Sequence, residues 1–252
     1  MSRNRLKTGL AERRPMAGLW LSLDAPAATE IAAGSGADWL LIDMEHSATG
    51  LESVVHHLRA AMAGPVEAVV RVPSAEPVMV KRALDLGARS LMFPMIDSAE
   101  DAARAVSYTR YPPDGMRGLS MTTRANNYGR DPGYLKGHVD DLCVIVQVET
   151  PQAVAAIPQI AAVPGVDAIF VGPADLSAAM GHLGGAQHPE AQAMIDRARA
   201  LAAEAGKPIG ILGFGTDLAR GYFARGFDFV AVAGDSWLLA RQMDAIIASL
   251  KG

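Results

Sequence analysis

Residues 145–150 read Ile-Val-Gln-Val-Glu-Thr, and residues 169–176 read Ile-Phe-Val-Gly-Pro-Ala-Asp-Leu. Each stretch is an apolar run that is followed by a carboxylate, Glu149 or Asp175. Continuous apolar runs of this length predict buried parallel strands. In a barrel of parallel strands, the carboxyl ends of the strands form the face on which sites are built. Two carboxylates at neighbouring strand ends therefore predict a site for a hard divalent cation.

The whole chain repeats this pattern by alternating short apolar runs with amphipathic stretches. The runs that predict strands are residues 16–23, 38–45, 66–72, 90–96, 142–149, 168–171, 208–212 and 229–232. The stretches that predict helices are residues 25–34, 51–63, 77–86, 99–108, 151–162, 189–205, 216–225 and 236–250. Eight strand–helix pairs are the number that closes a barrel. We therefore expect an α/β fold, a (β/α)8 TIM barrel, with residues 1–252 forming a single domain.

Composition excludes several classes of partner. The net charge is −4 with both signs interspersed, so nucleic acid is not an expected partner. No apolar run approaches the ~18 residues of a membrane span. Residues 1–14 are basic but lack a following apolar region, which predicts a short helix or tail rather than a signal peptide. The single cysteine, Cys143, lies within an apolar run; we expect a core thiol and a reducing cytoplasmic location.

Residues 111–141 break the alternation. This segment has little periodicity and is rich in Pro, Gly, Asn, Arg and Tyr. A loop of this length in a compact fold is usually functional or disordered. Its aromatic and arginine residues favour an ordered role, either over the active site or against another subunit, and the sequence does not choose between the two.

Polar side chains gather at the predicted strand ends, which a barrel brings to one face. They are Trp20, Asp43, Glu45, His46, Arg71, Gln147, Glu149 and Asp175. A single apolar run followed by a polar residue could occur by chance. The same pattern at several independent strands is much less expected by chance. Trp20 is either a wall of the site or a core aromatic residue.

Glu149 and Asp175 are the best candidate metal ligands. With only two carboxylates, Mg²⁺ or Mn²⁺ would keep several waters and open positions for a substrate. The alternative is that both acids cap helices or form strand-end ion pairs, and the surrounding Gly-Pro-Ala-Asp-Leu-Ser does resemble a helix start. The backbone amides of residues 172–175 are candidates for binding an anion such as a carboxylate, or they form an ordinary turn.

Arg71 and His46 are the candidate catalytic side chains. A guanidinium at the end of an apolar strand is costly unless it is paired, and its fork suits a substrate carboxylate, a keto oxygen or an enolate. The alternative for Arg71 is a buried ion pair with an acid such as Glu45. A neutral imidazole near carboxylates is a natural general base, and Asp85 is a candidate to orient it. The alternative for His46 is a surface or structural role, which we expect for His56, His57, His138, His182 and His188.

Six motifs, taken together, make the chain resemble the HpcH/HpaI aldolase family of metal-dependent class II pyruvate aldolases. The resemblance covers nearly the whole chain, and any one motif alone would be weak. The motifs are Gly18-Leu19-Trp20, Asp43-Met44-Glu45-His46, Val70-Arg71-Val72-Pro73, Pro113-Asp114-Gly115-Met116-Arg117-Gly118, Gln147-Val148-Glu149-Thr150 and Gly172-Pro173-Ala174-Asp175-Leu176-Ser177.

The resemblance implies a barrel whose last helix is exchanged between subunits, in a homo-hexamer that is a trimer of dimers. It implies reversible aldol cleavage of 4-hydroxy-2-oxo acids to pyruvate and an aldehyde, through a pyruvate enolate that a divalent metal (Mg²⁺, Mn²⁺ or Co²⁺) stabilises. By the same resemblance, Glu149 and Asp175 hold the metal and Arg71 stabilises the enolate. His46, oriented by Asp85, moves the proton of the C4 hydroxyl. The residues implied to line the substrate pocket are Trp20, Asp43, Gln147, Gly172, Pro173, Ala174, Asp175 and Leu212.

Two further observations bear on the mechanism and the substrate. No lysine follows the predicted strands named above, and Lys207 precedes one, which disfavours a Schiff-base mechanism. Residues 47–50 read Ser-Ala-Thr-Gly where the family pattern predicts a proline–asparagine pair, and this difference puts the aldehyde partner in doubt.

Two alternatives remain open. One is a related lyase for a coenzyme A thioester of the citramalyl or malyl type, which would need a groove for the nucleotide; the sequence has no Gly-rich phosphate loop. The other is a non-catalytic, metal-dependent binder of oxo acids, against which the combination of His46 and Asp85 argues.

Overall fold

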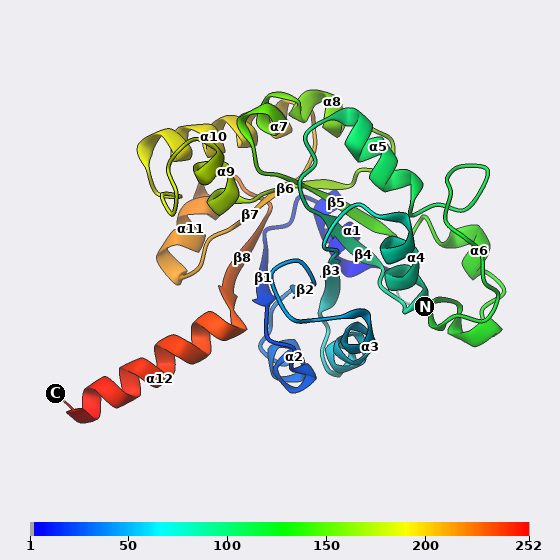
Figure 1. Ribbon diagram of the computed structural model, residues 1–252, viewed down its shortest axis with the longest axis horizontal. Coiled ribbons are helices and arrows are strands. Elements are labelled where there is room, and N and C mark those ends of the chain that lie inside the picture. Colours follow the sequence, from blue (N-terminus) through cyan, green and yellow to red (C-terminus); the bar gives the residue numbers. More distant parts are fainter. Residues whose placement is uncertain (1–2, 252) are drawn as a thin grey trace.

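The computed structural model describes residues 3–251, and eight parallel strands close a barrel in chain order. The strands are β1 (Met16–Leu21), β2 (Trp39–Asp43), β3 (Glu67–Arg71), β4 (Ser90–Phe93), β5 (Cys143–Val148), β6 (Ala168–Val171), β7 (Ile209–Leu212) and β8 (Phe229–Gly234). The predicted (β/α)8 barrel is confirmed (Figure 1). β3 and β4 end earlier than expected, and Pro73 and Pro94 follow shortly after them with no N–H to extend a ladder.

Six of the helices that follow the strands lie where the amphipathic pattern predicts them. They are α2 (Pro26–Ala33), α3 (Leu51–Ala60) with a short 3₁₀ extension η1 (Ala61–Ala63), α4 (Pro77–Asp85), α5 (Ala99–Ser107), α10 (Pro189–Glu204) and α11 (Thr216–Ala224). The helix expected over 151–162 is instead two, α7 (Pro151–Ala155) and α8 (Ile157–Ala161), because Pro158 cannot donate the helical hydrogen bond. A short helix, α9 (Pro173–Ala179), follows β6 directly, at the Gly-Pro-Ala-Asp-Leu-Ser stretch that resembles a helix start but is not among the predicted helices.

Large side chains fill the barrel interior, and the N-terminal helix closes the end at which the strands begin. Trp39, Phe170 and Phe229 pack together with ring centroids 5.6–6.4 Å apart. Helix α1 (Arg5–Ala11) adds Leu6 and Leu10 to this cluster from the end where the strands begin. Cys143 is fully buried in the same cluster and unpaired, as predicted. A second apolar layer lies between the strands and the surrounding helices.

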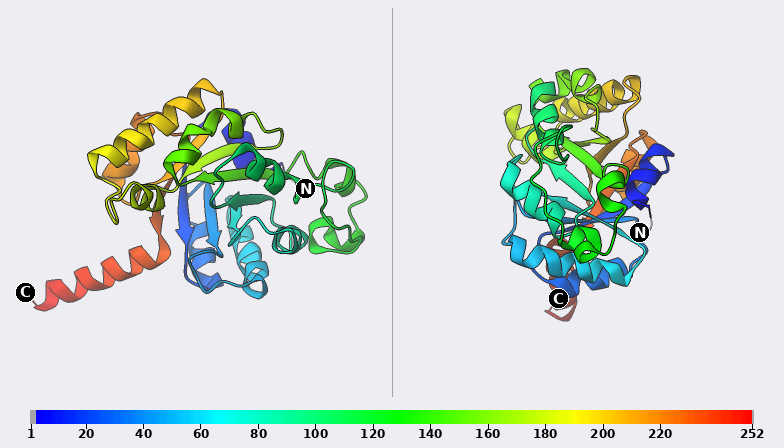
Figure 2. Two further views of the ribbon diagram at one scale, coloured as in Figure 1. Left: turned by 45° about the horizontal axis from the view of Figure 1, so that its top comes forward. Right: turned by 90° about the vertical axis from the view of Figure 1, so that its right-hand side faces the viewer.

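The last helix, α12 (Asp235–Lys251), extends away from the barrel instead of packing against it (Figures 1 and 2). None of its described side chains is buried. The helix nevertheless carries exposed apolar residues: Leu238, Leu239, Met243, Ile246, Ile247 and Leu250. No helix within residues 3–251 combines the length and apolar character that crossing a membrane requires.

Residues 111–141 form an ordered segment that connects α5 to the start of β5. The segment contains two short helices, η2 (Arg124–Gly129) and α6 (Tyr134–Gly137), and it buries Arg117. It lies beside α4 at the end of the barrel where strands begin. Within this chain the segment lies at the end of the barrel where strands begin, so of the two roles left open by the sequence its position favours contact with another subunit. Contact with another subunit remains a prediction.

Candidate active site

Asp43 and Arg71 form the centre of the polar face at the carboxyl ends of the strands. Asp43 is the last residue of β2 and Arg71 the last of β3, and the two are direct partners in the strand register. Arg71 Nε donates to Asp43 Oδ1 over 2.9 Å, and Arg71 Nη2 donates to Asp43 Oδ2 over 2.6 Å. Both side chains are almost fully buried. A buried bidentate pair of this kind fixes the guanidinium in one orientation.

Trp20 and Glu45 complete the surroundings of Arg71. The guanidinium lies over the Trp20 ring, 4.7 Å from its centroid, and Trp20 Nε1 donates to Asp43 Oδ2 over 3.0 Å. Arg71 Nη1 forms an ion pair with Glu45 Oε2 at 2.7 Å. The ion pair with Glu45 that the sequence left open as an alternative is therefore present, within the same cluster as the predicted pocket residues.

Burial and Arg71 act in opposite directions on these acids. Burial alone would raise the pKa of Asp43, but the hydrogen bonds and charge of Arg71 outweigh it and leave that pKa lowered. For Glu45 the balance is reversed: burial raises its pKa, and the charge of Arg71 only partly offsets the increase. Asp43 is thus the ionised partner that holds Arg71 in place.

Glu149 and Asp175 lie next to each other, as the sequence predicted from the neighbouring strands β5 and β6. Glu149 directly follows β5 and is 3 % exposed, whereas Asp175 is exposed in the first turn of α9. The backbone N–H of Met95 donates to Glu149 Oε1 over 3.0 Å. Burial raises the pKa of Glu149 to about 8, the Met95 hydrogen bond opposes this, and a hydrogen bond with Asp175 and the Asp175 charge add to it. Glu149 therefore favours its protonated form near neutral pH unless a cation lies beside it.

Gly172 leaves the space that these side chains occupy. A Cβ at this position would lie 2.7 Å from Glu149 Oε2 and 2.8 Å from Gln147 Nε2. Gln147 is 2 % exposed, and its Oε1 has no hydrogen-bond partner within the described chain. Pro173 begins α9, so the amides of Ala174 and Asp175 fall in its first turn, where helical N–H groups lack intrahelical acceptors. The unpaired Oε1 of Gln147, the carboxyl groups of Glu149 and Asp175, and the N–H groups of the first turn of α9 therefore lie together around Gly172.

His46 lies at the mouth of the barrel, but Asp85 does not lie beside it. The His46 side chain is exposed, and its backbone N–H donates to Asp43 Oδ1 over 3.3 Å. Asp85 is the last residue of α4. This helix starts near the carboxyl end of β3 and runs back to the opposite end of the barrel, where β4 begins. There the Asp85 carboxylate accepts a hydrogen bond from Arg117 Nη2 over 2.7 Å. Within one chain, Asp85 therefore pairs with Arg117, and the orientation of His46 by Asp85 stays a prediction.

Leu212 lies at the end of β7 on the same face, partly buried against the interior cluster together with Phe214. Glu45 was grouped with the polar residues at the strand ends, and the ion pair with Arg71 was its one suggested role. One contribution to the site was missed by sequence reasoning. Met95 contributes a backbone N–H from a residue with φ of 52°, for which the sequence carries no signal.

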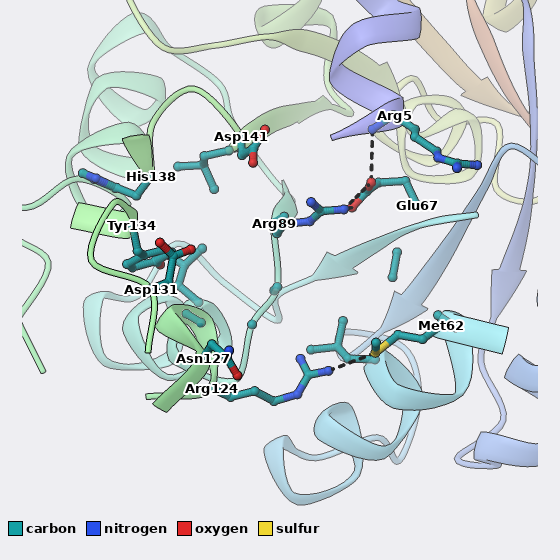
Figure 3. Close-up of a pocket in the computed structure, with 18 of the residues that line it drawn as sticks. Arg5, Met62, Glu67, Arg89, Arg124, Asn127, Asp131, Tyr134, His138 and Asp141 are labelled. Atoms are coloured by element: carbon teal, nitrogen blue, oxygen red, sulfur yellow. Dashed lines mark hydrogen bonds and ion pairs between the residues drawn. The ribbon is translucent and has the colours of Figure 1, made fainter. Parts of the chain in front are cut away.

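A large cavity of about 860 Å³ lies away from this cluster, between η1, α4, η2 and α6. Figure 3 shows its wall, in which the Arg5 backbone and the Arg89 side chain contact Glu67, and Arg124 contacts Met62. Residues at the starts of β3 and β4 line it. The cavity therefore opens at the end of the barrel opposite Arg71 and Glu149.

Comparisons with known proteins agree with this arrangement. A model of the family described as HpcH/HpaI aldolase/citrate lyase matches residues 16–241. The "4-hydroxy-2-oxo-heptane-1,7-dioate aldolase" of Shigella sonnei is 46 % identical over 246 residues, which cover 97 % of this chain and 94 % of that protein. A crystal structure of an HpcH/HpaI aldolase/citrate lyase family protein from Burkholderia cenocepacia is 44 % identical, with a TM-score of 0.96 and coverage of 99 % of this chain and 100 % of that chain.

A more distant structure shares the fold alone. The citrate lyase β subunit of Mycobacterium tuberculosis, complexed with oxaloacetate and magnesium, is 19 % identical, with a TM-score of 0.57 and coverage of 88 % of this chain and 91 % of that chain. The likeness extends the barrel architecture to a protein whose structure holds a 2-oxo acid and a divalent cation.

Proposed function

Because the chain belongs to the HpcH/HpaI aldolase/citrate lyase family, we propose that it is a carbon–carbon lyase that cleaves 4-hydroxy-2-oxo acids reversibly to pyruvate and an aldehyde. The observation that supports this most directly is the guanidinium of Arg71, fixed by Asp43 at the mouth that also holds Glu149 and Asp175. Aldol cleavage leaves negative charge on the pyruvate fragment. Donors that are oriented before the reaction stabilise charge where it develops.

Glu149 and Asp175 are the proposed ligands of a divalent metal. Their adjacent carboxyl groups and the unpaired oxygen of Gln147 make an oxygen-rich cradle, and the raised pKa of Glu149 shows that its ionised form lacks a compensating cation there. Such a set suits Mg²⁺, Mn²⁺ or Co²⁺. When bound, the metal would supply Lewis-acid polarisation of the substrate keto group.

Arg71 is the proposed donor to the keto oxygen. A guanidinium has five N–H groups. Two of them donate to Asp43, and Nη1 forms an ion pair with Glu45. The remaining N–H groups on Nη1 and Nη2 are available to an oxygen that gains charge during cleavage. Trp20 covers one face of the guanidinium and keeps water from that side.

His46 is the proposed general base for the C4 hydroxyl. The cleavage direction requires removal of that hydroxyl proton, and an imidazole near neutral pH suits the task. The backbone hydrogen bond of His46 to Asp43 ties its position to the acid that orients Arg71. We propose this role for His46 without a partner from Asp85, which is paired with Arg117.

The turn that begins α9 is the proposed binding site for the pyruvate carboxylate. Gly172 and Pro173 set the course of the backbone, and the amides of Ala174 and Asp175 are the donors. Leu212, at the end of β7, and Gln147 would form the walls beside the pyruvate fragment. The aldehyde partner is not specified by these contacts, since residues 47–50 depart from the family pattern.

Removal of metal tests the proposed reaction. The chelator-treated protein should release no pyruvate from a 4-hydroxy-2-oxo acid, and added Mn²⁺ or Mg²⁺ should restore release. Pyruvate methyl protons should also exchange in deuterated water, because the enolate forms on the enzyme. Full activity without metal would refute the metal-dependent mechanism, and pyruvate binding without exchange would favour the non-catalytic binder.

A coenzyme A thioester lyase is less well supported. Its nucleotide would need a groove near Arg71 and Glu149, whereas the large cavity opens at the other end of the barrel. If a titration showed that coenzyme A binds with micromolar affinity, the thioester lyase would be favoured over the pyruvate aldolase.

We also propose that the chain assembles as a homo-hexamer in which α12 packs on a neighbouring copy. The apolar residues of α12 are 45–79 % exposed, and burying such a stripe against another copy is the favourable alternative to leaving it in water. The double variant Met243→Asp, Ile247→Asp should therefore dissociate to smaller species in light scattering while keeping its circular dichroism. An unchanged mass would argue against the exchange.

We further propose a cytoplasmic location, because the single thiol, Cys143, is buried and unpaired. Subcellular fractionation followed by detection of the protein tests this.

A further inference from the structure

Two histidines and a glutamate meet on the loop between α9 and α10. One ring nitrogen of His182, one of His188 and one carboxylate oxygen of Glu190 lie within 4.8 Å of one another. His182 Nε2 is 2.9 Å from Glu190 Oε2, and the two imidazole rings stack with centroids 3.7 Å apart. No other group of three such side chains occurs within residues 3–251. The cluster contains none of the residues assigned to the barrel mouth.

The backbone of the loop brings the two rings together. The N–H of Gly185 donates to the carbonyl of His182 over 2.8 Å, and the N–H of His188 donates to the carbonyl of Gly185 over 2.8 Å. A Cβ on Gly185 would lie 3.0 Å from the His182 carbonyl oxygen and 3.1 Å from the His182 Cβ. Gly185 therefore permits the close approach, and Pro189 starts α10 so that Glu190 is placed in its first turn.

We propose that His182, His188 and Glu190 form a second metal site, for a borderline transition-metal ion such as Zn²⁺. Two imidazole nitrogens and one carboxylate oxygen are a common ligand set for zinc, whereas Mg²⁺ prefers oxygen ligands. The ligand atoms of a tetrahedral zinc lie roughly 3.3 Å apart, as bonds of about 2.0–2.1 Å require. His188 and Glu190 are exposed, so their side chains can rotate to close the remaining distance.

The ion affects two existing interactions. His188 Nδ1 accepts a hydrogen bond from the Glu190 N–H over 3.3 Å, and the His188 ring gives up this cap when it binds. The ion also takes the place of the proton between His182 Nε2 and Glu190 Oε2, which lie 2.9 Å apart. In return, the metal links the loop after α9 to the start of α10. Because α9 carries Asp175 in its first turn, the second site restrains the helix that supports one carboxylate of the barrel mouth.

Zinc binding by the intact chain in excess Mg²⁺ tests the proposal, since Mg²⁺ occupies oxygen ligands without competing for the histidines. Equilibrium dialysis against a zinc buffer should give one more Zn²⁺ per chain for the wild type than for His182→Gln or His188→Gln. The affinity of these variants should fall by about 100-fold or more, at the upper end of the loss seen on removing groups that support a metal. His56→Gln removes an exposed histidine on α3 and should bind zinc as the wild type does.

Two further measurements separate the site from the barrel mouth and from misfolding. Zinc should slow amide hydrogen exchange over residues 177–190 in the wild type but not in His188→Gln, and the two proteins should have the same melting temperature without zinc. Gly185→Ala, which moves His182, should also weaken zinc binding. Equal zinc stoichiometry and affinity in wild type and both histidine variants would overturn the proposal, as would complete displacement of zinc by excess Mg²⁺.

Discussion

The carboxylate of Asp43 accepts two hydrogen bonds from the guanidinium of Arg71, of 2.9 and 2.6 Å. Neighbouring strands place the two residues directly opposite each other. The pair is buried, so Arg71 cannot turn toward solvent. A donor that is fixed before the reaction loses no orientation when the substrate arrives.

We predict that Arg71→Ala lowers turnover by at least ~100-fold, as expected for the loss of one donor to a developing charge. Arg71→Lys should recover little of it, because a lysine keeps the charge but cannot form the bidentate contact with Asp43. The measurement is the rate of methyl-proton exchange of pyruvate in deuterated water. A near-normal rate in Arg71→Ala would remove this residue from the mechanism.

Asp43→Asn should destabilise the fold as well as impair turnover. The substitution keeps the shape of the side chain but leaves the buried guanidinium with Glu45 as its one remaining acid. Removing one partner of a buried ion pair typically costs about 3–5 kcal/mol, and urea unfolding measures the loss. The matched control is Asp196→Asn, which breaks the surface pair with Arg225 and should cost less than about 1 kcal/mol. Equal losses in the two variants would contradict the prediction.

The metal-free protein should lose stability as the pH rises from about 5 to about 8. Burial raises the pKa of Glu149 to about 8, so in this window the folded state binds more protons than the unfolded state, and the free energy of unfolding falls with increasing pH. Urea midpoints at several pH values measure the slope. Glu149→Gln should have a shallower slope, and a slope equal to that of the wild type would show that Glu149 does not titrate in this range.

Gly172→Ala should weaken metal binding without preventing folding. The new methyl group would lie 2.7 Å from Glu149 Oε2 and 2.8 Å from Gln147 Nε2 and would push both side chains out of place. We expect metal affinity to fall by about 10- to 100-fold, as for changes that disturb the surroundings of ligands. Titration with Mn²⁺ measures the affinity.

Gly221→Ala is the control for the glycine substitution. Gly221 lies in α11, and a methyl group added there would meet no atom within 4 Å, so alanine should stabilise the helix by up to about 1 kcal/mol. Its metal affinity should equal that of the wild type. A similar loss of affinity in both variants would mean that the crowding at Gly172 is not the cause.

The sequence predicted the barrel because each strand is a short apolar run and each main helix has an amphipathic period. It indicated only the start of α9, because the seven residues after Gly172 are too few to display a helical period. It also placed one helix over 151–162, where Pro158 divides the segment into α7 and α8. The pattern of apolar residues along the chain therefore predicts the order of strands and helices better than the residues at which each helix begins and ends.

The sequence grouped the residues of the site through the shared position of strand ends. Asp43, Arg71, Glu149 and Asp175 each follow or end a strand, and closure of the barrel brings them to one face. Asp85 is not part of this group within one chain, because it ends helix α4 and the reversal of the chain after β3 carries it to the opposite face. The Met95 amide had no signal, since a backbone donor depends on conformation and not on residue type.

Helix α1 determines from which side the barrel is accessible. Leu6 and Leu10 of this helix cover the end of the barrel where the strands begin. The side-chain amide of Asn4 holds the helix in place by donating a hydrogen bond to Ser90. Because side chains also fill the barrel interior, residues 3–251 leave Arg71 and Glu149 accessible from the carboxyl ends of the strands and not through the barrel. Substrate entry and product release therefore share one side of the molecule, so a product that stays bound blocks the next substrate.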